Sequence, residues 1–190
     1  MGFLDAFVGG AVISLVALYV KKTYQEVQYV ESRVDGYRYL VRRAEDSQEA
    51  ADTLARLNAR VERLVAHLAA AHPADERTGL LRDRYDRSAL SEGGHNSGYT
   101  SFSVNKGEKI VMCIRSRDGS DENGDIEQFN TLMYVILHEL AHLVTEEIGH
   151  TPTFWDNFRW ILDQAEEAGV YAKVDYSKEP EDYCGININS

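Results

Sequence analysis

A run of five residues beyond the middle of the chain combines two histidines with a glutamate at a spacing that suits metal chemistry. His138-Glu139-Leu140-Ala141-His142 places the histidines four residues apart. In a helix, residues four apart lie on one face, so both imidazoles can bind one ion. Glu139 lies beside the first histidine, where it can take a proton from a metal-bound water. The pattern therefore predicts hydrolysis at a zinc ion.

A third ligand is expected from His150, eight residues after His142. Gly149 can end the helix because glycine adopts the left-handed backbone of a C-terminal cap, and the chain can then turn His150 back to the metal. Glu166 or Glu167 is an alternative third ligand, as in zinc peptidases that use a distal glutamate. A degenerate site that binds metal without catalysis, or histidines that are simply packed in a core, would contain the same motif.

The residues around this motif predict two consecutive helices. Residues 131–144 read TLMYVILHELAHLV and are apolar nearly all round, as in a helix buried in a core. Burying two imidazoles and a carboxylate there without partners would be costly, and a metal removes that cost. Thr151-Pro152 then reads as an N-cap followed by proline at the first helical position. The packing face of this second helix consists of Phe154, Trp155, Phe158, Ile161 and Leu162.

Shorter patterns upstream predict a hairpin and two further helices. Residues 99–104 and 109–115 alternate and are rich in β-formers, with Asn105-Lys106-Gly107 between them, which predicts a β-hairpin. Apolar residues at alternating spacings of three and four predict amphipathic helices over residues 27–44 and 54–68. Residues 38–41, close to Gly36, could instead form a short strand. His72-Pro73 ends this part, because proline disfavours helix in the residue before it.

The N-terminus predicts a membrane anchor. Residues 6–20 carry no charge, Phe3-Leu4-Asp5 precedes them, and Lys21-Lys22 follows at once. At about 1.5 Å per residue this stretch can just cross a thin bilayer. The positive-inside rule then puts the catalytic part on the cytoplasmic side. The alternative is a helix that is buried in the protein or that forms an oligomer.

Composition suits one modest core with an extension. The 190 residues are 44% hydrophobic and 27% charged. We expect a membrane-anchor helix at 1–22, an amphipathic helical segment at 23–72 and a catalytic domain at 73–190. The net charge of −11 falls on the last of these, so direct nucleic-acid binding is not expected and the expected partner is a protein substrate. The only cysteines, at 113 and 184, are too few for a disulfide framework, which favours a reducing compartment.

HELAH followed by GHTPTFW resembles the active sites of the WLM and SprT-like metalloproteases, and most closely a WLM-type group of large DNA viruses of algae. The likeness covers residues 34–188 and includes YTSFSVNKGEKIVMCIRSRD and VDYSKEPEDYCGI. It implies a compact zincin domain with one zinc held by His138, His142 and His150, and with Glu139 as general base and acid. It also implies that the hairpin of residues 99–115 supplies the strand edge that binds an extended substrate. Thr151 stands where the family pattern more often has serine.

The expected fold is α+β: a small zincin-type metalloprotease domain, built from an active-site helix and a small antiparallel sheet, preceded by N-terminal helices. The expected function is that of a membrane-tethered, zinc-dependent metalloprotease that hydrolyses peptide bonds in protein substrates. Tyr99 is a candidate donor to the oxyanion. The alternative is a structural, membrane-associated or virion protein whose zincin-like domain does not cleave. The intact Glu139 favours the enzyme, since a structural site needs no base.

Overall fold

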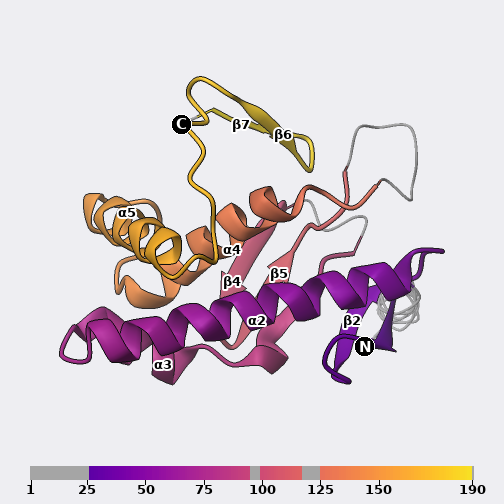
Figure 1. The fold of residues 1–190 in the computed structure, drawn as a ribbon. Coiled ribbons are helices and arrows are strands. Elements are labelled where there is room, and N and C mark those ends of the chain that lie inside the picture. The colour runs from indigo at the N-terminus through magenta and orange to yellow at the C-terminus, as the bar shows by residue number, and fades with distance from the viewer. Residues whose placement is uncertain (1–25, 95–98, 117–124, 190) are drawn as a thin grey trace, which may run out of the picture.

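The computed structural model describes residues 26–94, 99–116 and 125–189, and in this part of the chain it mixes helices with small sheets. Helix α2 runs across nearly the whole width of the molecule, with α4 above it and a C-terminal hairpin at the top (Figure 1). This is the α+β class that the sequence predicted. In chain order the elements are β1 (Val27–Glu31), β2 (Arg38–Arg42), α2 (Ser47–Ala71), α3 (Glu76–Arg84), the 3-10 helix η1 (Arg87–Ala89), β3 (Leu90–Glu92), β4 (Ser101–Val104), β5 (Lys109–Met112), α4 (Phe129–Val144), α5 (Pro152–Glu167), β6 (Glu181–Tyr183) and β7 (Ile186–Ile188).

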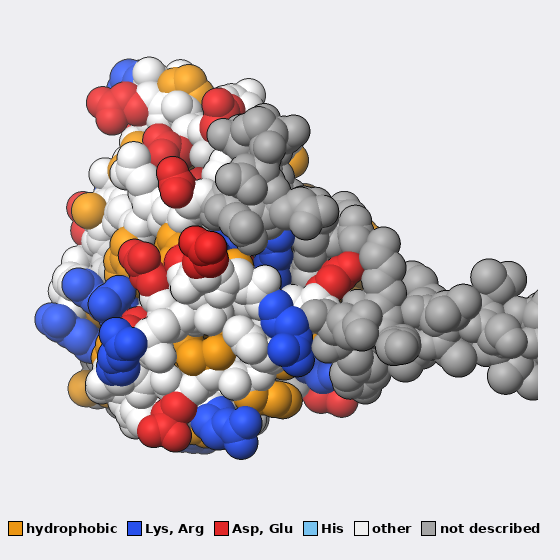
Figure 2. Space-filling model, turned by 90° about the vertical axis from the view of Figure 1, so that its right-hand side faces the viewer, with side chains coloured by type: hydrophobic (Ala, Val, Ile, Leu, Met, Phe, Trp, Pro, Cys, Tyr) orange, Lys and Arg blue, Asp and Glu red, His pale blue; other side chains and the backbone are white. Residues whose placement is uncertain are grey.

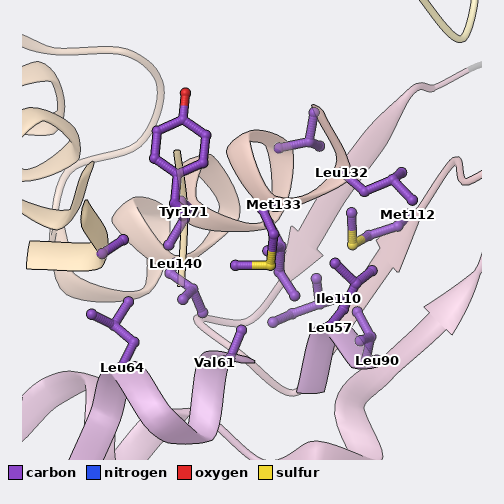
Figure 3. Close-up of a cluster of buried hydrophobic side chains, with 14 of the residues drawn as sticks. Leu57, Val61, Leu64, Leu90, Ile110, Met112, Leu132, Met133, Leu140 and Tyr171 are labelled. Carbon is purple, nitrogen blue, oxygen red and sulfur yellow. The ribbon is translucent and has the colours of Figure 1, made fainter. Parts of the chain in front are cut away.

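Helices α2 and α4 share one hydrophobic core with strand β5. α2 contains the helix predicted over residues 54–68 and ends at Ala71, just before His72-Pro73, as expected. The core contains residues from both sides of residue 72, where a domain boundary was predicted, and that boundary stays a prediction. Fully buried members of the core are Leu57, Val61 and Leu64 of α2, Ile110 and Met112 of β5, and Leu132, Met133 and Leu140 of α4 (Figure 3).

The first predicted amphipathic helix, over residues 27–44, is wrong: this segment is a β-hairpin. β1 pairs antiparallel with β2, Val27 opposite Arg42 and Glu31 opposite Arg38, and Gly36 has a φ of 71° in the turn. Valines and tyrosines make up much of this segment, and such residues favour strands. Over so short a stretch their three-and-four spacing does not separate helix from strand. The alternative of a short strand at residues 38–41 is the right one.

The hairpin predicted between residues 99 and 115 is confirmed. β4 pairs antiparallel with β5, Ser101 opposite Met112, and Asn105, Lys106 and Gly107 form the turn with positive φ. The predicted small sheet is mixed rather than antiparallel, because β3 joins the other side of β5 in parallel. β4 is therefore an edge strand of this three-stranded sheet.

The C-terminal hairpin β6–β7 is tied to the sheet at its turn. A disulfide joins Cys184 to Cys113, which follows β5. The Tyr183 hydroxyl also donates to the Cys113 carbonyl at 2.5 Å, and the Cys184 N–H donates to the Glu127 carboxylate at 2.9 Å. The sequence had predicted no disulfide framework, because the chain has only two cysteines. They are separated by 71 residues, and the tertiary fold brings them together.

The predicted membrane-anchored localisation is overturned. Across residues 26–94, 99–116 and 125–189, no helix combines the length and the apolar character needed to cross a bilayer. The longest helix, α2, has 25 residues but carries charged side chains along its length. The anchor predicted at residues 1–22 lies outside the described residues.

Candidate metal centre

Two histidines of α4 lie side by side at one wall of a cleft. The ring centroids of His138 and His142, one helical turn apart, are separated by 5.0 Å. The helix around them is almost wholly buried, as its apolar sequence predicted. Packing against the core therefore fixes the direction in which both imidazoles point.

Helix α4 ends at Val144, five residues before the glycine that was expected to end it. Thr145 has an extended backbone and its hydroxyl donates to the Ala141 carbonyl at 2.7 Å. Lys106 from the β4–β5 turn donates to the carbonyls of His142, Thr145 and Glu147. A cation at the negative end of a helix stabilises this early stop. Gly149 does adopt a positive φ of 86°, but in the loop that follows.

Helix α5 fixes the third histidine. Thr151 is its N-cap and accepts a hydrogen bond from the Phe154 N–H at 3.3 Å, and Pro152 follows, as predicted. His150, just before the cap, brings its Nε2 to 3.0 Å from that of His138. One nitrogen from each of His138, His142 and His150 lies within 4.8 Å of the others. Nitrogens that share one tetrahedral zinc are about 3.3 Å apart, so this cluster can hold such an ion after small rotations.

The aromatic ring of Phe154 packs against all three imidazoles. Phe154 is fully buried, and its ring centroid lies 4.3 Å from that of His142, 4.7 Å from that of His150 and 4.9 Å from that of His138. The sequence assigned Phe154 to the packing face of its helix. Its position beneath the whole histidine cluster depends on how α5 crosses α4, which a helical pattern does not reveal.

Glu139 is 4% exposed and is held by the edge strand. Ser103 of β4 donates to its carboxylate through both its main-chain N–H and its hydroxyl, a contact that the sequence did not predict. The Oε2 atom of Glu139 is buried and has no hydrogen-bond partner among the described residues. Burial raises the pKa of Glu139 to about 7, against the lowering effect of the Ser103 hydrogen bonds. A carboxyl group with such a pKa can both take up and release a proton near neutral pH.

Burial also keeps two of the imidazoles neutral. It lowers the pKa of His138 to about 3, with a further contribution from the neighbouring histidines, and that of His142 to about 4. The neutral ring is the form that binds a metal. The two histidines of α4 are therefore ready to bind a cation without first losing a proton.

The cluster opens into a cleft of about 790 Å³. Its walls come from α4, β4, the loop before α5 and the hairpin β6–β7. The Cys113 N–H donates to the Thr100 carbonyl, so by the alternation of an antiparallel pair the main-chain groups of Ser101 and Ser103 point away from β5. The free edge of β4 thus lies along the cleft.

The other candidate residues lie elsewhere. The Glu167 carboxylate lies 3.9 Å from His67 of α2, and neither it nor Glu166 belongs to the group of converging ligand atoms. Tyr99 is 68% exposed and does not line the cleft. The structure brings together His138, His142, His150 and Glu139, and it does not bring the alternative ligands to them.

Comparison with known proteins gives three viral relatives. An uncharacterized protein R325 of Acanthamoeba polyphaga mimivirus is 33% identical over 186 residues, covering 94% of this chain and 91% of that protein. An uncharacterized protein 136R of Invertebrate iridescent virus 6 is 36% identical over 94 residues, covering 50% and 51%. An uncharacterized protein 042R of Invertebrate iridescent virus 3 is 50% identical over 75 residues, covering 37% and 42%.

Two further similarities are to a domain family and to a solved structure. The sequence pattern of the WLM domain matches residues 90–184, from β3 to the disulfide-bonded Cys184. Among solved structures, Wss1 from Saccharomyces cerevisiae is similar with a TM-score of 0.44 and 18% identity, covering 66% of this chain and 85% of that one.

Proposed function

Because the chain belongs to the WLM domain family, we propose that it is a zinc-dependent metalloprotease that hydrolyses peptide bonds in protein substrates. One observation carries the proposal: three imidazole nitrogens converge within 4.8 Å beside a buried carboxylate, one oxygen of which has no partner in the described part of the chain. Three histidines with an open fourth position are a common ligand set of catalytic zinc. A structural zinc site would need neither the open position nor the carboxylate.

The proposed roles follow from where each side chain lies. His138, His142 and His150 would hold the ion, which when bound polarises a water molecule and the substrate carbonyl. Glu139 takes the proton of the attacking water at its unpartnered Oε2 and passes it to the leaving amine nitrogen. Ser103 holds the other side of this carboxylate in place. Within one site, the attacking water therefore donates the proton, Glu139 carries it and the leaving amine nitrogen accepts it.

The substrate is proposed to bind in extended form along β4. The outward main-chain groups of Ser101 and the outward carbonyl of Ser103 can pair with a peptide strand, as in other cases of strand addition to a sheet edge, whereas the Ser103 N–H already donates to Glu139. Such binding depends on the main chain, so it accepts a wide range of sequences. Specificity must then come from side-chain contacts in the cleft.

The partner is proposed to be protein rather than nucleic acid. Acidic and basic side chains are interspersed on the face in Figure 2, in a chain with a net charge of −11. A phosphate backbone is attracted by concentrated positive charge.

Metal analysis and a cleavage assay on the full chain test the proposal. We expect one zinc per chain, loss of cleavage of unfolded proteins after chelation, and its return when zinc is added back. His150→Ala should lose both zinc and cleavage, whereas Glu139→Gln should keep zinc and lose cleavage. If the wild type binds zinc and cuts none of a broad panel of unfolded proteins, the alternative of a non-proteolytic structural domain is correct.

A further inference from the structure

We propose that the cleft selects an uncharged, apolar side chain next to the peptide bond that is cleaved, and that Ile148, Trp155 and Ile186 make this selection. The inference rests on the proposed function, since it assigns a substrate class to the same cleft. The substrates would be extended or unfolded protein segments that contain residues such as leucine, isoleucine, valine or phenylalanine.

Exposed apolar side chains gather at the cleft. Six large hydrophobic residues are exposed among the described residues, and three of them line this one cavity. Ile148 is 95% exposed, Ile186 49% and Trp155 40%. Single exposed apolar residues are common on any surface, but a group of them around a concave site marks a place where apolar groups bind.

Two of the three flank the third histidine of the candidate metal centre. The ring centroid of Trp155 lies 5.6 Å from that of His150. Ile148 precedes His150 by two residues in the loop between α4 and α5. Both therefore lie next to the position where a bound substrate would be cut. Ile186 joins them from β7, at the start of the last strand of the tethered hairpin.

The charged residues of the cleft offer little to attract a charged substrate. Apart from the proposed base, only Lys106 and Glu147 carry formal charge among the non-histidine residues that line it. They have opposite signs, and Lys106 already donates to carbonyls at the end of α4. Glu147 accepts a hydrogen bond from the Thr153 hydroxyl at 2.9 Å. The remaining polar lining consists of hydroxyl, main-chain and amide groups, from Thr100, Ser101, Ser103, Asn105, Tyr134, Tyr183, Asn187 and Asn189.

Extended binding and apolar selection together define the substrate. A peptide that adds to the edge of β4 presents alternate side chains to opposite sides, so one of them faces the apolar residues at the cleft. In folded proteins large apolar side chains are mostly buried and lie within secondary structure. A main chain that is extended and also presents such a side chain is found where a protein is unfolded.

The test uses the zinc-loaded full chain and a library of synthetic peptides in which one position carries every amino acid in turn, with cleavage sites read by mass spectrometry. We expect cleavage next to apolar residues to exceed cleavage next to aspartate or lysine by roughly tenfold, the scale that burial of one aliphatic side chain supports. Ile148→Ser and Ile186→Ser should each reduce this preference several-fold. Val34→Ser is the matched control: Val34 is 48% exposed, lies in the β1–β2 turn, does not line the cleft, and its replacement should leave the preference unchanged.

Binding of the same peptides to zinc-loaded Glu139→Gln, followed by fluorescence anisotropy, separates this inference from the proposed function. If the wild type cuts nothing but the variant binds apolar peptides roughly tenfold more tightly than charged ones, the protease assignment fails and the selectivity stands. Equal cleavage or equal binding of apolar and charged peptides overturns the inference. So does an absence of any peptide binding, or a change in Val34→Ser as large as that in Ile148→Ser.

Discussion

Glu92 and Glu139 are buried to nearly the same degree, 3% and 4% exposed, yet their surroundings differ. Both oxygens of Glu92 have partners: Arg115 donates to one at 2.6 Å and the Arg42 N–H to the other at 2.7 Å. Glu139 is held by Ser103, and its Oε2 has no partner among the described residues.

This difference in hydrogen bonding distinguishes a glutamate that stabilises the fold from one that belongs to the candidate site. A buried polar group without a hydrogen bond destabilises a fold, so chains normally supply the partner themselves. For Glu92 the partner is Arg115, which is fully buried and also forms an ion pair with Asp46, so this cluster joins β3 and the end of β5 to the start of α2. For Glu139 the oxygen that has no partner among the described residues belongs to a side chain lining a cleft with three histidines, where a bound water or substrate can supply the partner.

Glu139→Gln gives the largest expected effect. Glutamine keeps the shape of the side chain but cannot accept the proton of the attacking water, so cleavage should fall about a thousandfold. Zinc content and the free energy of unfolding should not fall. Steady-state kinetics, metal analysis and urea unfolding measure the three quantities. A variant that still cuts at more than a tenth of the wild-type rate contradicts the role of Glu139.

Glu92→Gln should have the opposite effects: it should lower the free energy of unfolding and leave zinc binding and cleavage nearly unchanged. Removing one partner of a buried ion pair leaves the charge of Arg115 poorly compensated, and we expect a loss of about 3 kcal/mol in the free energy of unfolding. At a temperature where the variant is folded, zinc affinity and cleavage should be close to wild type. Glu31→Gln, at an exposed position of β1, is the control and should change stability by less than about 0.5 kcal/mol.

In metal-free protein, the pH dependence of the free energy of unfolding tests whether Glu139 is buried without a compensating partner. Burial raises the folded-state pKa of Glu139 from 4.5 to about 7, so between these values the folded state keeps a proton that the unfolded state has lost. The wild type therefore loses stability as the pH rises through this range. Glu139→Gln does not titrate, so its stability relative to wild type should rise with pH by up to about 3 kcal/mol and then level off. Urea unfolding in the presence of a chelator measures this difference, and a difference that stays flat across the range contradicts it.

Thr151→Ala should have the smallest effect. It removes the hydroxyl that caps α5 next to His150, and a lost N-cap costs about 1 kcal/mol. Because the cap fixes the entry to α5, zinc affinity should also fall by a few-fold. Thermal unfolding and zinc titration measure the two losses. Thr151→Ser keeps the acceptor and should restore both, and a serine variant as weak as the alanine variant would count against the cap.

The convergence of the three histidines could be anticipated because its information is local. His138 and His142 share one helical turn, and His150 follows within a short loop, so sequence spacing alone brings them near each other. Thr151-Pro152 marked the start of α5 for the same reason. The end of α4 was misplaced, because Lys106, a residue from the β4–β5 turn, stabilises its last carbonyls.

The parts that were not anticipated depend on residues distant in sequence. Ser103 meets Glu139 only because β4 packs beside α4, and Glu92 meets Arg115 only because β3 lies parallel to β5. The spacing of Cys113 and Cys184 in the sequence does not indicate a disulfide bond between them. The prediction of a helix over residues 27–44 was wrong because the spacing of its apolar residues fits helix and strand alike, whereas its valines and tyrosines favour strands.

The covalent link between Cys113 and Cys184 encloses β6 and helices α4 and α5, with all three histidines of the cluster, in one loop of the chain. If the backbone is nicked in the segment between α5 and β6, by this protein itself or by another protease, the C-terminal piece stays attached. A nicked preparation would then migrate as one species on a denaturing gel and separate into two only after a thiol is added.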